Sequence, residues 1–171
     1  MDRTDTCKAA LAAAALFCAT PAAAQATSAD GRGHALILVP LELTKIDDLD
    51  FGTIVAGSTP GTVIIPANGS ARSTTGGVTP LPSDVGFRAR FATAATRGQE
   101  VLFLLTPPAT LDDGNGNSIT VDAMTMDGPN LRYADLTTGI IFVGVGGIIS
   151  VAADQPDGVY EGTFNLYAEY R

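Results

Sequence analysis

The chain has 171 residues, of which 46% are hydrophobic and only 16% are charged, and its formal net charge is −8. This acidic balance argues against partners that are themselves anionic, such as nucleic acids or anionic membrane surfaces. The length suits one domain with an adequate hydrophobic core.

The N-terminus has the order of features that is typical of a cleavable signal peptide, over residues 1–26. Two basic residues precede an unbroken apolar run over residues 9–19. The run holds roughly eleven residues, whereas a bilayer span needs about 20. Small residues follow, and A-x-A frames allow cleavage after Ala24 or after Ala26. We therefore expect export through the inner membrane to the periplasm, the cell surface or the medium, with no transmembrane segment.

Both cysteines of the chain, Cys7 and Cys18, lie inside this predicted signal. The exported chain is therefore expected to contain no disulfide. Small exported domains often use disulfides to supplement their cores. Here the stability must come from packing and strand pairing.

After a predicted flexible tail over residues 27–34, residues 35–171 are expected to form a single domain of short strands. The first apolar alternation begins at residue 35 and includes Ile37, Val39 and Leu41. Pro40 has no backbone donor, which indicates an edge strand or a bulge. Residues 67–84 are rich in Gly, Ser, Thr and Pro and are expected to form a loop with one short strand. Further strands are expected over residues 49–55, 62–65, 87–91, 99–106 and 119–126.

Residues 140–153 are apolar but are interrupted by Gly144, Gly146 and Gly147, which indicates a bulge or two short strands. No stretch combines a helical period with caps. Seven to nine short strands between Gly and Pro turns predict an all-β fold, an antiparallel, immunoglobulin-like β-sandwich. A jelly roll and a barrel are the alternative topologies.

The last segment, residues 158–171, alternates apolar and polar side chains more regularly than any other. Tyr160, Phe164, Leu166 and Tyr170 lie on one face of the expected strand. A terminal strand of this regularity is expected at the centre of the sandwich.

This segment resembles the last strand of subunits of chaperone–usher pili. In that class the strand has alternating apolar residues, an aromatic penultimate residue and a glycine fourteenth from the end. Here Tyr170 is penultimate and Gly158 is fourteenth from the end. The resemblance implies β-strand addition, in which a periplasmic chaperone or the N-terminal tail of the next subunit completes the sandwich. The cysteine pair common in those pilins is absent from the mature chain.

A second resemblance spans nearly all of the mature chain. Together its motifs resemble the bacterial domain of unknown function 4402 family, whose members are small exported proteins with pilin-like and spore-coat-U-like sandwich domains. The resemblance implies this fold and export, and no enzyme activity. The motifs are LDFGTIV at 49–55, GTV at 61–63, GGV at 76–78, VG at 143–144, GVYEGTF at 158–164, and Tyr170.

The sequence holds little material for catalysis. His34 is the one histidine, so sites that need Cys or His ligands, and nucleophiles that need a His base, lack their components. The acidic turn DDGNGN invites a calcium site but fails the EF-hand pattern, because the sixth position from Asp113 is Ser118 and the twelfth is Met124. We expect no catalytic residue, no metal, no cofactor and no enzyme activity.

We therefore expect a non-enzymatic structural or adhesion protein, a pilin-like subunit that assembles by strand complementation. Residues 27–43 would complete a neighbour's sandwich, and residues 158–170 would form one wall of the groove. The partner would be another copy, giving a homopolymer, or a periplasmic chaperone. The candidate strand-pairing residues are Ile37, Val39, Leu41, Tyr160, Phe164, Leu166 and Tyr170.

The alternative function is a monomeric β-sandwich that binds a small ligand or a glycan at the cell surface. Such a module would be expected to carry an aromatic cluster on its loops. Tyr133 is the main candidate outside the terminal strand.

Overall fold

The structure is a computed structural model that describes residues 28–171. The chain divides into two units, Met1–Ala35 and Leu36–Arg171. Within the first unit, residues 28–35 are exposed and belong to no strand. The expected signal peptide and both of its possible cleavage sites lie outside the described residues.

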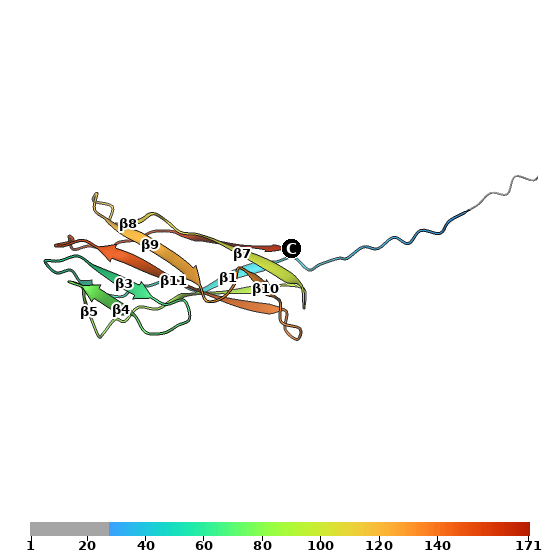
Figure 1. Cartoon of the computed structure of the whole chain (residues 1–171), viewed down its shortest axis with the longest axis horizontal. Coiled ribbons are helices and arrows are strands. Elements are labelled where there is room, and N and C mark those ends of the chain that lie inside the picture. Colours follow the sequence, from blue (N-terminus) through green and yellow to red (C-terminus); the bar gives the residue numbers. More distant parts are fainter. Residues whose placement is uncertain (1–27) are drawn as a thin grey trace, which may run out of the picture. The chain divides into compact units, whose positions relative to one another are not determined.

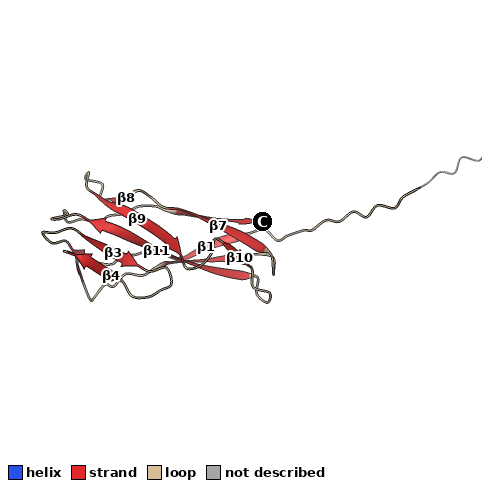
Figure 2. Ribbon diagram, in the orientation of Figure 1, coloured by secondary structure: helices blue, strands red, loops and turns tan. Residues whose placement is uncertain are grey.

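The second unit consists of strands and loops, which confirms the expected all-β class (Figure 2). The described residues form twelve strands instead of seven to nine, and four of them have only two or three residues. In this part of the chain no helix is long and apolar enough to cross a membrane. The strands are β1 (Glu42–Asp47), β2 (Ile54–Val55), β3 (Gly61–Ile65), β4 (Ser73–Gly76), β5 (Thr79–Pro80), β6 (Ala89–Ala94), β7 (Glu100–Thr106), β8 (Thr110–Asp112), β9 (Ser118–Met126), β10 (Leu131–Tyr133), β11 (Ile140–Val151) and β12 (Asn165–Tyr170).

The strands pair in three antiparallel sheets of unequal size. The largest sheet has seven strands and is organised by β11, which bonds to β6 along its first half and to β3 and β9 along its second half (Figure 1). Strand β1 extends this sheet beyond β6, β4 extends it beyond β3, and β8 extends it beyond β9. The second sheet has the order β10-β7-β12, and the third is the short pair β2-β5.

Two apolar clusters form the core. The first lies where β6 and β11 face β7, and its most buried members include Val101, Phe103 and Val143. The second lies on β3, β9 and the end of β11, around Val63 and Ile149. The three-stranded sheet contributes buried residues only to the first cluster. Loop residues such as Phe51 and Tyr160, which are only partly buried, pack on the second cluster.

Two expected strands differ from the observed ones. The first begins at Glu42 rather than at residue 35, after Pro40, which cannot donate to a ladder. The last strand, β12, begins only at Asn165, and it pairs with β7 alone. The expectation that this strand is central was wrong, because alternation identifies the inward face of a strand and not its neighbours.

Strand β11 runs as a single strand through Gly144, Gly146 and Gly147, so the expectation of two short strands was wrong. Its pairing with β9 does shift register between Ile148 and Ile149, directly after these glycines, in agreement with the alternative of a bulge. The glycines are there because other parts of the chain cross directly over the strand. A Cβ atom on Gly146 would overlap the carbonyl oxygen of Ile65 and the amide nitrogen of Ala67. A Cβ atom on Gly144 would meet Ala67 and the side chains of Arg88 and Asp127.

Replacing Gly146 by Ala should destabilise the fold, because backbone atoms that cannot rotate away occupy the space of the new methyl group. We expect a loss of about 1–3 kcal/mol in the free energy of unfolding, the usual cost of overpacking. Urea titration followed by circular dichroism measures it. Gly128→Ala is the matched control, since its nearest neighbours are at ordinary contact distance and belong to the flexible Arg132 side chain. Equal losses in both variants would contradict the close approach.

Candidate functional site

The strongest candidate site is an open seam between the two main sheets. We define the seam by its two walls, residues 41–54, which contain β1, and residues 158–170, which contain β12. Strand β1 pairs with β6 and β12 pairs with β7. In the described residues no strand pairing joins β1 to β12, so each strand leaves one edge of backbone donors and acceptors without a ladder.

Apolar side chains line both walls of the seam but remain only partly buried. Leu41 and Leu43 lie on the first wall, and Phe164, Leu166 and Ala168 lie on the second. All of them pack against the first core cluster. The Phe164 ring meets the buried Phe91 ring edge-on, with 5.9 Å between ring centroids. The seam is therefore a place where the core reaches the surface.

One end of the seam is closed by a group of hydrogen bonds that we call the clasp, formed by Tyr170, Thr96 and Val39. The phenol oxygen of Tyr170 accepts from the Thr96 amide at 2.6 Å and donates to the Val39 carbonyl at 2.9 Å. The Val39 amide donates to the Thr96 hydroxyl oxygen at 2.9 Å. Val39 is thus held through both of its backbone groups. The clasp fixes the point from which the chain before Val39 leaves the domain.

Removing the Tyr170 hydroxyl should weaken this end of the seam. We expect Tyr170→Phe to lower the free energy of unfolding by about 1–3 kcal/mol, because the Thr96 amide loses its partner. Amide hydrogen exchange should accelerate at Thr96 and Val39. Tyr167→Phe is the control, because Tyr167 lies on the exposed face of the same strand. If Thr96 exchanges at the same rate in all three proteins, the clasp carries no stability.

The other end of the seam opens into a cavity of about 650 Å³. Residues 48–54 form one side of the cavity and residues 158–164 form the other. The second wall is anchored here by β8, since Asp112 and Glu161 exchange backbone hydrogen bonds of 2.9 and 3.0 Å. Acidic side chains stand among the lining residues, namely Asp48, Asp50, Asp84 and Glu161. Its apolar lining comes mostly from the second core cluster and includes Leu111, Ile119, Val121, Met124 and Ile149.

The first wall of the cavity is held in place by Arg72 and Asp84. The Arg72 guanidinium donates to the carbonyl oxygens of Phe51, at 2.7 Å, and of Leu81, at 3.0 Å. The Thr53 hydroxyl donates to Asp84 Oδ2 at 2.6 Å, and this hydrogen bond lowers the pKa of the Asp84 carboxyl. The charged form of Asp84 therefore supports the wall.

The contribution of Asp84 to the free energy of unfolding should depend on pH. Because folding lowers the pKa of this carboxyl, its stabilising effect is complete above the ordinary Asp pKa and is lost as the pH falls through the lowered value. Asp84→Asn should therefore be less stable than the unsubstituted protein at neutral pH, and the difference should shrink in acid. Urea titrations between neutral and acidic pH measure this gap, the difference in the free energy of unfolding between the two proteins. A gap that is constant with pH would contradict a role for the charge.

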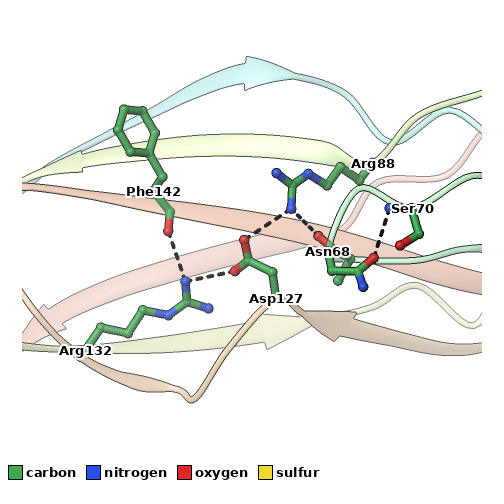
Figure 3. Close-up of polar contacts among 7 residues, drawn as sticks. Asn68, Ser70, Arg88, Asp127, Arg132 and Phe142 are labelled. Carbon is green, nitrogen blue, oxygen red and sulfur yellow. Dashed lines mark hydrogen bonds and ion pairs between the residues drawn. The ribbon is translucent and has the colours of Figure 1, made fainter.

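The opposite side of the sandwich, where β10 lies near β11, is closed by charged groups (Figure 3). Arg132 Nη1 donates to Asp127 Oδ1 at 2.9 Å and to the Phe142 carbonyl at 3.0 Å, at the point where β9 no longer pairs with β11. Arg88 approaches the other oxygen of Asp127 at 3.3 Å and donates to the Ala67 carbonyl. Arg132 also stacks over the Phe103 ring at 5.6 Å. This edge of the sandwich is therefore occupied, whereas the seam is not.

The structure brings most of the predicted strand-pairing residues to the seam. Phe164, Leu166 and Tyr170 lie on its second wall, and Tyr160 lines the cavity. Leu41 packs against the core of its own domain. Val39 is 54% exposed and Ile37 is 91% exposed.

Sequence reasoning missed the groups that act through main-chain contacts, namely Thr96, Arg72, Arg88, Asp127 and Arg132. The alternation of residues 87–91 indicates that Arg88 and Arg90 share a solvated face, but the Arg88 side chain is mostly covered. Arg88, Asp127 and Arg132 each stand next to apolar residues in the sequence, which is the one available signal for them, whereas the sequence around Arg72 and Thr96 carries no such signal.

The described residues contain no group of three or more His, Cys, Asp or Glu side chains that could hold a metal ion. In the DDGNGN turn, Asp113 accepts from the amides of Asn115 and Asn117 at 2.8 and 3.0 Å. A side-chain hydrogen bond from Asn117 lowers the pKa of this carboxyl. The carboxylate thus stabilises the turn itself. Tyr133 is exposed on β10, where Glu100 raises the pKa of its phenol.

The family model described as "Domain of unknown function (DUF4402)" matches residues 41–170. The match covers all twelve strands of the described residues, and the chain therefore belongs to this family. No curated protein and no solved structure matches the chain.

Proposed function

We propose that this protein is an exported, non-enzymatic structural subunit that assembles with copies of itself by strand complementation. In this assembly the segment before Val39 of one copy fills the seam of the next. The observation that carries the proposal is the seam, where two unpaired strand edges flank apolar side chains that are only partly buried. Backbone groups of an added strand would pair along an edge, and alternate side chains would complete the core.

The segment before Val39 has the pattern that such a strand requires. One face is uncharged throughout and consists of small and apolar residues. The other is polar over Ser28, Asp30, Arg32 and His34 and ends with Leu36 and Leu38. The segment over residues 27–38 has twelve residues, and the second wall, residues 158–170, has thirteen, so the two are of similar length. The described part of this segment is exposed except for Leu38, so it is available to a neighbour. The uncharged face is Ala29, Gly31, Gly33, Ala35 and Ile37.

Two contacts support a shorter donated segment than residues 27–43. Leu41 belongs to the core of its own domain, and the backbone of Val39 is bonded in the clasp. The donated segment therefore ends before Val39, and Ile37 is its principal apolar side chain. A strand lent by a periplasmic chaperone would fit the same seam before assembly.

Deleting residues 27–37 should abolish self-association, because the seam loses its occupant while the clasp at Val39 remains. We expect monomers only, measured by size-exclusion chromatography with light scattering on the exported protein. Leu136→Ser is the matched control, since Leu136 is another strongly exposed apolar residue, 78% accessible, outside both walls of the seam. An unchanged distribution of oligomers in the deletion variant would contradict the proposal.

A further inference from the structure

We infer that Asn115, at the tip of the turn between β8 and β9, is a modification site whose side-chain amide is lost without the help of an enzyme. The reaction converts the residue into aspartate and isoaspartate and adds one negative charge to the turn. This inference goes beyond the proposed assembly and does not depend on it. It follows from a comparison of the two Asn-Gly pairs of the chain, Asn68-Gly69 and Asn115-Gly116.

The reaction needs a main-chain amide that is free to attack the side chain before it. The Gly116 nitrogen loses its proton and bonds to the side-chain carbonyl carbon of Asn115, while the bond from that carbon to the side-chain nitrogen breaks and ammonia leaves. Water then opens the resulting cyclic imide at one of its two carbonyl carbons, which gives aspartate or isoaspartate. One water is consumed and one ammonia is released. Glycine favours the attack because it has no Cβ to obstruct the approach.

The pair Asn115-Gly116 meets these requirements. Both residues are exposed, and a Cβ atom placed on Gly116 would have no neighbour within 4 Å. Within residues 28–171 the Gly116 amide donates no hydrogen bond, so it is open to solvent. The Asn115 side chain makes one contact, from its nitrogen to the Asp113 carbonyl at 3.3 Å, which is longer than a typical hydrogen bond. The side chain is therefore free to turn toward Gly116.

The pair Asn68-Gly69 is equally exposed but is held by its neighbours (Figure 3). The Gly69 amide donates to the Pro66 carbonyl at 3.2 Å, and the Asn68 side-chain oxygen accepts from the Ser70 amide at 2.9 Å. The Arg88 guanidinium lies over Gly69, 3.3 Å from where a Cβ atom would be. Ring closure at Asn68 must break both hydrogen bonds, and a bonded amide gives up its proton less readily. The structure therefore protects Asn68 and leaves Asn115 reactive.

Conversion of Asn115 affects the second wall of the seam through the turn. Asp113 holds the turn by accepting from the amides of Asn115 and Asn117 at 2.8 and 3.0 Å. Isoaspartate lengthens the main chain between these amides by one carbon, and either product places a second carboxylate near Asp113. The turn fixes the pairing of β8 with β9. Asp112 of β8 exchanges hydrogen bonds of 2.9 and 3.0 Å with Glu161, so a loosened turn weakens this anchor of the wall.

The site is tested by incubating the full exported chain at neutral and at mildly alkaline pH and following both Asn-Gly pairs by peptide mass spectrometry. Replacement of the amide by a carboxyl changes the mass, whereas isomerisation of an Asp residue does not. We expect Asn115 to convert several-fold faster than Asn68, and faster at the higher pH because the attacking amide must lose its proton. In urea that unfolds the domain, the ratio of the two rates should fall toward one. Equal rates in the folded protein, or the same ratio in urea, would overturn the inference.

The effect on the wall is measured on the same incubated protein. The converted fraction carries one more negative charge, so ion-exchange chromatography separates it from the unconverted fraction. We expect amide hydrogen exchange at Asp112 and Glu161 to be several-fold faster in the converted fraction. Asn115→Gln is the matched control, because its longer side chain closes a ring far more slowly, and its exchange rates should stay constant during the incubation. Equal exchange in the two fractions would overturn the link between the turn and the second wall.

Discussion

The domain depends on β11, because this strand is bonded to β6, β3 and β9 and thereby positions most of the large sheet. Its glycines allow residues 66 and 67 to pass so closely over the strand that any side chain would collide with them. Val143, Val145 and Ile149 on its inner face belong to the two core clusters. The close backbone contact on one face and the packing on the other hold this glycine-rich strand in place.

The large sheet has seven strands and the facing sheet has three, so the second layer covers only part of the first. The side near β11 is closed by Arg132, which donates both to the Asp127 carboxylate and to the Phe142 carbonyl that a strand would otherwise bond. Charged groups at an edge also prevent unwanted strand pairing. The side at the seam has apolar residues and no such block along the described length of β12. This difference between the two edges supports the proposed strand addition at the seam.

The sequence was sufficient for the fold class and for the inward face of the last strand, since Phe164, Leu166 and Tyr170 all pack against the core. It could not place that strand at an edge, because a period of two residues is the same for central and edge strands. The clasp depends on a contact between Tyr170 and Val39, which are 131 residues apart. The glycines of β11 suggested an interruption of the strand. Their actual role, to let residues 65–67 pass close by, could not be predicted because that segment lies far away in the sequence.

The open seam links the proposed assembly to the stability of the domain. In the proposed assembly the half-buried side chains of the walls become fully buried when a strand is inserted, and burying apolar surface is the main favourable contribution to folding. A partner that binds only the folded domain stabilises it, by about 2.7 kcal/mol when its concentration is a hundred times the dissociation constant. In a chain with no cysteine outside its predicted signal, a complementing strand thus supplies stability that small exported domains often obtain from disulfides. On the proposed assembly, each copy therefore reaches its full stability only after it has accepted a neighbour.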